Sequence, residues 1–308
     1  MEVYNVTIFG IHLTVRPVAF TLPIGKNGWD IYWYGIIIAV GFLLAVVYGA
    51  RNAKRFDLDF DKLLDVIIVT VPVAILCARA YYIIFSDEHV SSLSGFFGFS
   101  SGSGFSGIAI YGGVIGAAIC GTLMCKLKKI KMLDALDLAA LGFLIGQGVG
   151  RWGNFTNQEA FGSLTGSTFW GMASENTEKL VGKGLVHPCF LYESIWCIAG
   201  FFVLHFLSKK RRFSGEIALY YCVWYGFGRA IIELLRTDSL KLGPFRVSCL
   251  LSILICAGAA VTLVLLRNRR KEAVRESEYV GVFSDELSID ADESGEQQIN
   301  TDDGEENE

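Results

Sequence analysis

Two arginines and one glutamate recur at helical spacing in the segment YGFGRAIIELLR, which begins at Tyr225. Arg229 and Glu233 are four residues apart and Arg236 follows three residues later, so a helix places all of them with Tyr225 on one face. A buried structural ion pair is one interpretation. However, two arginines exceed one carboxylate, and a guanidinium left free is suited to bind a phosphate or carboxylate through two hydrogen bonds.

A second polar group follows a glycine-rich run in the segment GQGVGRWGNFTNQEAFG, residues 146–162. The glycines allow close backbone approach. Arg151, Asn154 and Glu159 come within nine residues of one another. A cation beside amide N–H donors can hold an anion, and the alternative is a capped helix end with a surface turn.

Single polar or aromatic residues stand in several other apolar stretches: Tyr34, Arg79, Tyr111, His187 and Glu193. Each has a structural alternative. An arginine near a helix end can extend to the membrane surface, a tyrosine can be an interfacial anchor, and a histidine can be hydrogen-bonded in the fold. Because all of them fall in the same half of the expected helices, the sequence indicates a site for an anionic, lipid-like molecule.

Seven apolar stretches must position these residues. The chain has 308 residues, of which 52% are hydrophobic and 19% charged. This composition excludes disorder as the main state and a strongly basic nucleic-acid-binding domain. Stretches of this length and hydropathy cross a hydrocarbon core about 30 Å thick, which predicts an all-α integral membrane fold with seven transmembrane helices. The predicted spans are Ile31–Ala50, Leu64–Phe85, Ile108–Cys125, Leu133–Val149, Cys189–Leu207, Glu216–Leu235 and Val247–Leu266.

The distribution of Lys and Arg predicts the orientation of the chain. Alternate connections hold 17 of the 27 cations and the opposite connections hold 8, so the N-terminus is expected outside and the C-terminus in the cytoplasm. Residues 1–30 are expected to form an extended interfacial segment, and 31–267 the membrane domain with a long outer loop over 150–188. Residues 86–107 read as a flexible loop, and 268–308 as a basic, then acidic, disordered tail.

The motifs that the chain lacks narrow the chemistry. None of the eight cysteines forms a CxxC pair, and no HExxH or Walker pattern is present. We therefore expect neither a metal nor a nucleotide cofactor. A transporter for an anionic solute remains an alternative, although it needs polar residues in the inner halves of the spans, which are mostly apolar. A packing scaffold is a third, and it leaves the intramembrane arginines without a use.

The segment GRWGNFTNQEAFG, Gly150–Gly162, resembles the signature of the bacterial prolipoprotein diacylglyceryl transferase family. Five other segments are similar to that family in the same order: YWYG, ARAYY, GIAIYGGVIG, HPCFLYE and YGFGRAIIELLR. The resemblance covers about residues 25–266.

This resemblance implies a reaction and its partners. A diacylglyceryl group passes from phosphatidylglycerol to the thiol of the lipobox cysteine of a prolipoprotein signal peptide, and glycerol phosphate leaves. It implies a multi-pass bacterial cell-membrane protein in contact with membrane lipids, with its site near the outer leaflet and no cofactor or nucleic acid. The catalytic residues expected are Arg151, Arg229 and Tyr111. The substrate-binding residues expected are Tyr34, Arg79, Asn154, Glu159, Gly162, Tyr225, Glu233 and Arg236.

Tyr111 departs from the family pattern, in which many members carry a histidine that is a candidate base for the thiol. A tyrosine with an ordinary pKa of about 10 is a poor base at neutral pH. Three explanations are open. The arginines lower the pKa of Tyr111, so that it can act as a base. Otherwise Tyr111 only orients a ligand, or the arginines lower the pKa of the substrate thiol. We favour the last. Ala78, where a glycine is common, is a minor departure.

Overall fold

The computed structural model describes residues 3–23, 28–86, 96, 107, 109–237, 241–242 and 245–270. The chain divides into two compact units, residues 1–259 and residues 260–308, and the described part of the second is helical. Most of the loop expected over 86–107 and nearly all of the expected tail lie outside the described residues.

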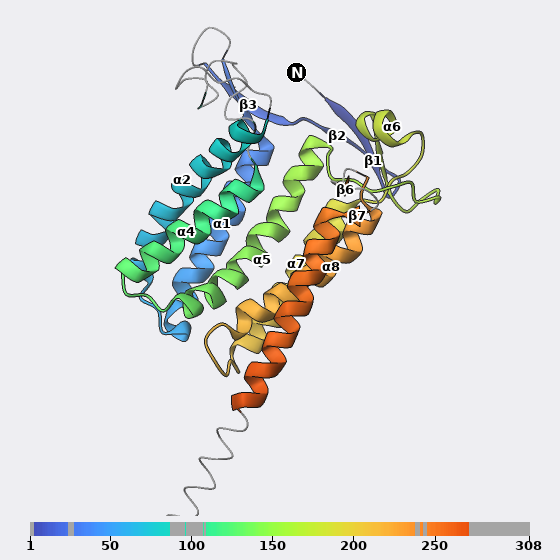
Figure 1. Ribbon diagram of the computed structural model, residues 1–308. Coiled ribbons are helices and arrows are strands. Elements are labelled where there is room, and N and C mark those ends of the chain that lie inside the picture. Colours follow the sequence, from blue (N-terminus) through green and yellow to red (C-terminus); the bar gives the residue numbers. More distant parts are fainter. Residues whose placement is uncertain are drawn as a thin grey trace, which may run out of the picture. The chain divides into compact units, whose positions relative to one another are not determined.

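Long apolar helices dominate the fold (Figure 1). Six helices among the described residues are long and apolar enough to cross a membrane. They are α1 with the following turn η1 (Trp33–Phe56), α2 (Phe60–Phe85), α4 (Ile110–Leu127), α5 (Met132–Asn157), α7 (Cys189–Ser208) and a final helix over Val247–Arg270. The helix α8 (Glu216–Leu235) forms where the sequence predicted it, but it is not among the six and carries three charged residues: Glu216, Arg229 and Glu233.

The helix α5 runs eight residues further than the sequence predicted. We expected it to end at Val149 and a loop to start at residue 150, but it continues to Asn157. The glycines of this run allow close packing. A Cβ atom at Gly153 would lie 2.8 Å from the ring of Tyr34 on α1, and one at Gly148 would lie 3.1 Å from Ile198 on α7. Arg151 and Asn154 are therefore helical residues.

Small residues also bring α2 and α4 together. A Cβ atom at Gly112 would lie 2.5 Å from the carbonyl oxygen of Cys77, and one at Gly116 would lie 2.6 Å from the Cβ atom of Cys77. This approach fits the small-residue interfaces of membrane helices, where burial of apolar surface drives no association. It positions the N-terminal turn of α4, which carries Tyr111.

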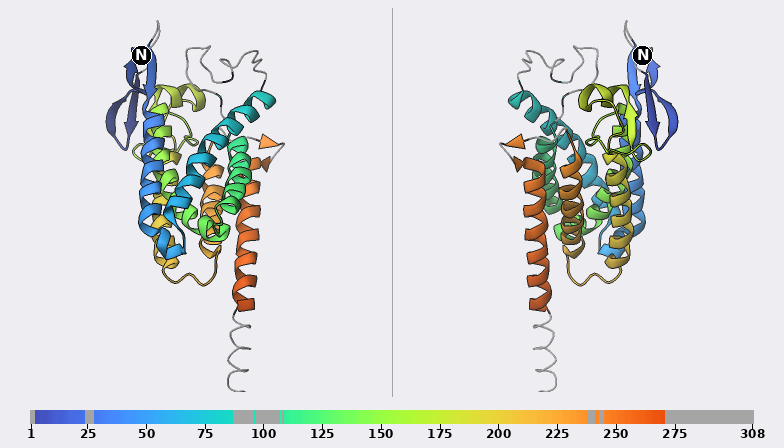
Figure 2. Two further views of the ribbon diagram at one scale, coloured as in Figure 1. Left: turned by 90° about the vertical axis from the view of Figure 1, so that its left-hand side faces the viewer. Right: turned by 90° about the vertical axis from the view of Figure 1, so that its right-hand side faces the viewer.

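Short strands add to the helices at the end where α5 stops and α7 begins, which we call the strand end (Figures 1 and 2). The strands β1 (Tyr4–Ile8), β2 (Ile11–Val15) and β5 (Met172–Ser174) form an antiparallel sheet in the order β2-β1-β5. The strands β3 (Val18–Leu22) and β4 (Trp29–Tyr32) form a pair, as do β6 (Lys241–Leu242) and β7 (Phe245–Arg246). The described N-terminal residues are thus extended, and the sequence did not predict that they pair into sheets.

Two buried apolar clusters lie on either side of the polar residues of interest. The first joins η1 (Ala53–Phe56), α5, α7 and α8 and contains Phe56, Leu141, Leu144, Leu204 and Ile217. The second lies beneath the sheet at the strand end, beside α6 (Glu175–Val181) and the start of α7, and contains Val6, Phe161, Met172, Val186 and Phe190. Packing on both sides fixes the helices between them.

The start of α8 is capped from another helix. Asp137 of α5 is fully buried and accepts hydrogen bonds from the backbone N–H groups of Gly215 and Ala218, each at 2.8 Å. Its Oδ2 atom also accepts from Arg211 at 3.0 Å. The first N–H groups of a helix have no partner within it, so this carboxylate supplies what the helix itself lacks. It also complements the positive end of the helix dipole.

Asp137→Ala is expected to lower the free energy of unfolding by about 3 kcal/mol, because it leaves Arg211 and two buried N–H groups without this acceptor. Reversible unfolding of the purified protein in detergent micelles measures the change. The control is Asp65→Ala. It removes a half-exposed ion pair with Lys128, which is expected to contribute at most about 1 kcal/mol. Equal losses in the two variants would contradict the role of Asp137.

Candidate functional site

Three arginines surround one buried glutamate at the strand end. One oxygen of Glu193 forms a close ion pair with Arg151. The other oxygen lies 2.7 Å from Arg229 and 3.6 Å from Arg236. Arg229 also contacts Glu233 at 2.7 Å, one helical turn further along α8. These five residues, which we call the arginine cluster, hold three guanidinium groups against two carboxylates.

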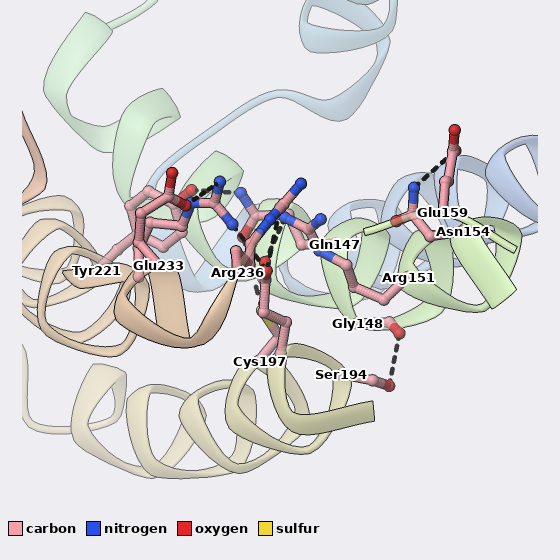
Figure 3. Close-up of polar contacts among 12 residues, drawn as sticks. Gln147, Gly148, Arg151, Asn154, Glu159, Ser194, Cys197, Tyr221, Glu233 and Arg236 are labelled. Atoms are coloured by element: carbon pink, nitrogen blue, oxygen red, sulfur yellow. Dashed lines mark hydrogen bonds and ion pairs between the residues drawn. The ribbon is translucent and has the colours of Figure 1, made fainter. Parts of the chain in front are cut away.

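The residues of the arginine cluster come from three helices, and Glu193 of α7 connects the arginines of the other two. Arg151 comes from α5, Glu193 from the second turn of α7, and Arg229 with Glu233 from the last two turns of α8. Arg236 follows α8 directly and has extended backbone angles, φ −72° and ψ 144°. In Figure 3 the side chains of Glu233, Arg236 and Arg151 point toward a common region. The predicted helical face was therefore right for Arg229 and Glu233, but Arg236 lies beyond the helix end.

The expectation of one free guanidinium on α8 is wrong. Arg229 contacts both Glu193 and Glu233, and Arg236 contacts Glu193. The sequence reasoning paired the two arginines with Glu233 alone, because Glu193 lies 40 positions away on another helix. The surplus of positive charge remains, and it is distributed over several guanidinium groups.

Interlocked tryptophans fix α7 against α8 beside the arginine cluster. The rings of Trp196 and Trp224 stack with centroids 4.5 Å apart. The indole N–H of each donates to the backbone carbonyl of the other at 3.0 Å. Gly200 and Gly228 leave the room that these rings need, because a Cβ atom at either glycine would overlap an indole. Glu193 and Arg229 therefore face each other across a rigid helix pair.

Hydrogen bonds hold α5 against α7 at the same level. The hydroxyl of Ser194 donates to the backbone carbonyl of Gly148 at 2.7 Å, and the indole of Trp152 donates to Ser194 at 3.2 Å. A serine that follows Glu193 directly thus ties its helix to the helix of Arg151. The spacing between Arg151 and Glu193 is set by backbone contacts as well as by their charges.

A layer of uncharged polar side chains adjoins the arginine cluster. Tyr225 stacks on Tyr221 with ring centroids 5.6 Å apart and nearly parallel planes. Gln147 of α5 donates to the hydroxyl of Tyr221 at 2.8 Å, and the thiol of Cys197 lies 4.0 Å from the Gln147 carbonyl oxygen. Tyr225 thus belongs to this uncharged layer through its contact with Tyr221.

Asn154 and Glu159 form a separate pair beyond Arg151 along the chain (Figure 3). The amide of Asn154 donates to a carboxylate oxygen of Glu159 at 2.9 Å. The ring of Tyr34 packs against Gly153, next to Asn154. The structure thus brings three predicted substrate-binding residues together, adjacent to the arginine cluster.

Gly162 is the point where three segments meet. Its N–H donates to the carbonyl of His187 at 2.9 Å, and the next N–H, of Ser163, donates to Leu235 at 2.8 Å. Gly162 also forms an isolated β-bridge with Arg236. A Cβ atom here would lie 2.8 Å from the Cβ atom of His187 and 2.9 Å from the carbonyl oxygen of Leu235. A glycine is needed because these contacts fix the backbone of Arg236.

Arg79 and Tyr111 lie on a different helix pair from the arginine cluster. Arg79 of α2 is buried and donates to the backbone carbonyls of Phe96 and Gly107 at 2.9 and 3.0 Å, and its guanidinium lies over the ring of Tyr82. It thus holds the backbone at these two positions. Tyr111 of α4 is 42% exposed, and within the described residues the structure records no polar contact for its hydroxyl. The structure does not bring either residue into contact with the arginine cluster.

Sequence reasoning noted Glu193 but left it out of the expected site residues, and it missed Gln147 and the paired tryptophans. The signal for Glu193 was an acidic residue inside an apolar span, which membranes tolerate only with a partner. The tryptophan interlock has no such signal, because its reciprocal N–H donors depend on the crossing of α7 and α8.

Chemically, the arginine cluster can bind an anion. Within the described ranges no group of three or more His, Cys, Asp or Glu is placed to hold a metal ion.

The chain is similar to known proteins over most of its length. The family described as prolipoprotein diacylglyceryl transferase matches residues 17–265. Three relatives are each named phosphatidylglycerol–prolipoprotein diacylglyceryl transferase. The protein from Clostridioides difficile (strain 630) is 38% identical over 260 residues, which is 84% of this chain and 98% of the relative. That from Pediococcus pentosaceus is 40% identical over 270 residues, 84% and 92% of the two chains. The protein from Clostridium novyi (strain NT) is 36% identical over 268 residues, which is 85% of this chain and 100% of the relative.

Gly162→Ala is expected to lower the free energy of unfolding by about 1–3 kcal/mol, because the added methyl group meets backbone and side-chain atoms that cannot all move away. Thermal unfolding in micelles measures this loss. The matched control is Gly146→Ala on α5, where a Cβ atom has no neighbour within 4 Å and the better helix former is expected to be neutral or stabilising. If Gly162→Ala is as stable as the control, the packing role is wrong.

Proposed function

The chain belongs to the prolipoprotein diacylglyceryl transferase family, and from this premise we propose how its residues carry out the reaction. The protein is a multi-pass bacterial membrane transferase in the maturation of lipoproteins. It transfers the diacylglyceryl group of phosphatidylglycerol to the thiol of a lipobox cysteine in a prolipoprotein signal peptide and releases glycerol phosphate.

The arginine cluster is the observation that carries the mechanism. In the reaction a sulfur–carbon bond forms to the glycerol carbon of the diacylglyceryl group, and the bond from that carbon to a phosphate oxygen breaks. The thiol proton passes to solvent or to the released phosphate. The phosphodiester has one negative charge and the leaving monoester between about 1.5 and 2 at neutral pH. Arg151 and Arg229 bind the phosphate and stabilise the charge that develops on the leaving oxygen.

The placement in the membrane follows from the charge pattern of the connections. We take α8 as a seventh span, because it packs against α5 and α7 and its Arg229 and Glu233 are paired within the protein. The N-terminus then faces outward, the C-terminus faces the cytoplasm, and the strand end with the arginine cluster lies near the outer leaflet. Phosphatidylglycerol enters from that leaflet and the signal peptide from the bilayer. Residues 31–267 form the catalytic domain, and 1–30 and 268–308 lie outside it.

The residues next to the arginine cluster complete the binding site. Asn154 and Glu159 offer an amide and a carboxylate to the hydroxyl groups of the glycerol headgroup, and Tyr34 holds Asn154 in place through Gly153. Tyr225 lines the site, and Glu233 orients Arg229. Arg79 acts on substrate indirectly, because its guanidinium binds the backbone carbonyl groups of Phe96 and Gly107.

The thiol must lose its proton before it attacks. Arg151, Arg229 and Arg236 create a positive potential that lowers the pKa of a nearby thiol. This removes the need for a strong protein base. Tyr111 lies on another helix pair, so it contacts the reacting centre only through the bound substrates and does not accept the proton.

The activity is tested directly with the full-length protein. The purified enzyme is incubated in micelles that contain phosphatidylglycerol with a peptide bearing a lipobox cysteine. The expected results are a gain in peptide mass equal to one diacylglyceryl group and one glycerol phosphate released per peptide. No mass gain, with flux of an anionic solute through proteoliposomes, would favour the transporter alternative.

Arg151→Ala and Arg229→Ala are each expected to lower kcat/KM at least 100-fold, because one fixed donor to the developing phosphate charge is lost. Release of glycerol phosphate measures the rate. The control is Lys209→Ala, at the C-terminal end of α7 and far from the arginine cluster, which is expected to change the rate less than twofold. Near wild-type turnover in both arginine variants would show that the site is assigned to the wrong residues.

Tyr111→Phe is expected to lower kcat by less than tenfold and to leave the pH dependence of kcat/KM unchanged, because the hydroxyl contacts the reacting centre but accepts no proton. Rates between pH 6 and pH 9 measure the profile. Loss of the rise of wild-type activity with pH in Tyr111→Phe, or a rate as low as that of the arginine variants, would instead identify Tyr111 as the base.

A further inference from the structure

The two carboxylates of the arginine cluster differ in the number of arginines that they contact. Glu193 contacts Arg151, Arg229 and Arg236, and its two oxygens face different arginines. Glu233 contacts Arg229. Glu193 is thus the carboxylate that joins the arginine of α5 to those of α8 and the segment after it.

The two carboxylates lie deeper than the arginines they bind. The side chain of Glu193 is 4% exposed and that of Glu233 is 1% exposed. The side chains of Arg151, Arg229 and Arg236 are 19%, 16% and 12% exposed. An anion that reaches the site therefore meets guanidinium N–H groups, and Glu193 lies beneath them.

Within its five residues the arginine cluster holds three guanidinium groups and two carboxylates. Arg246 adds a guanidinium that donates to the backbone carbonyl of Glu233. Guanidinium groups in excess of carboxylates within the cluster suit a phosphodiester, which has one negative charge. Without Glu193, three arginines would face one carboxylate, and the site would hold the more highly charged glycerol phosphate more tightly.

We propose, resting on the proposed function above, that Glu193 is a positioning residue with a second effect on product release. It aims three guanidinium groups at one point, and it shares their charge so that glycerol phosphate dissociates after the transfer. Glu193 touches neither substrate. It acts through the arginines, as a counter-ion that competes with bound phosphate for the same N–H donors.

Glu193→Gln separates this role from a purely structural one. The amide keeps the size of the side chain and removes the charge. Binding of glycerol phosphate to the purified protein is measured by calorimetry in micelles of uncharged detergent at low salt. We expect its Kd to fall about tenfold, its inhibition constant as a product to fall with it, and kcat to fall at least tenfold. The KM for phosphatidylglycerol should change less than threefold. A disrupted site would bind the anion more weakly, which is the opposite sign.

Two further variants serve as controls. Glu193→Asp keeps the charge on a shorter side chain, so kcat is expected to fall while the Kd for glycerol phosphate stays within threefold of the wild type. Asp134→Asn removes a buried carboxylate that contacts Arg211 at 2.6 Å, about 25 Å from Arg151 along α5. It is expected to lower the unfolding midpoint and leave the Kd for glycerol phosphate unchanged.

Three results would overturn the proposal. The first is unchanged or weaker binding of glycerol phosphate in folded Glu193→Gln. The second is tighter binding in Glu193→Asp, which can be measured even if Glu193→Gln does not fold. The third is a tighter Kd in Asp134→Asn. Failure of the proposed function is a separate outcome, because it appears as absent turnover in the wild-type protein, whereas the calorimetry needs no turnover.

Discussion

A single buried carboxylate shared among three guanidinium groups is the interaction on which the rest of the site depends. Glu193 lies within an apolar helix, where a lone charge is costly, and each arginine carries the same cost. Together they satisfy one another. No single helix supplies both the anion and all of the cations. The helices α5, α7 and α8 must therefore bring these residues to the same position along the bundle.

The helix α8 is fixed at three levels, which explains how its arginine keeps its position. Asp137 caps its start, Trp224 interlocks with Trp196 in its middle, and Glu193 binds Arg229 near its end. A helix of 20 residues is about 30 Å long. Contacts at both ends and the centre leave little freedom for the helix to tilt or rotate, so the position of Arg229 is fixed by the fold.

Close packing and charge are coupled in this protein. Gly148 and Gly153 bring α5 against α7 and α1, and Gly162 brings the chain after α5 against the end of α8. The first two glycines flank Arg151 on α5, and Gly162 forms a bridge with Arg236, so close packing fixes the positions of both arginines. The pair α2–α4 uses the same small-residue contacts but carries Arg79 and Tyr111, which have other surroundings. The arginine that stands inside α2 donates to backbone carbonyl groups, whereas those of α5 and α8 contact the carboxylate of Glu193.

The sequence by itself determined the apolar helices, the placement of Arg229 and Glu233 on one face of α8, and the family. These depend on local composition, on helical spacing and on a contiguous motif, all of which are readable along the chain. Only the tertiary structure decided that α5 continues through its glycines, that Glu193 joins the three arginines, and that Arg79 and Tyr111 lie on another helix pair. The physical reason is the same in each case. Close helix approach and a shared counter-ion connect residues far apart in sequence, and single-chain spacing carries no information about which helices meet.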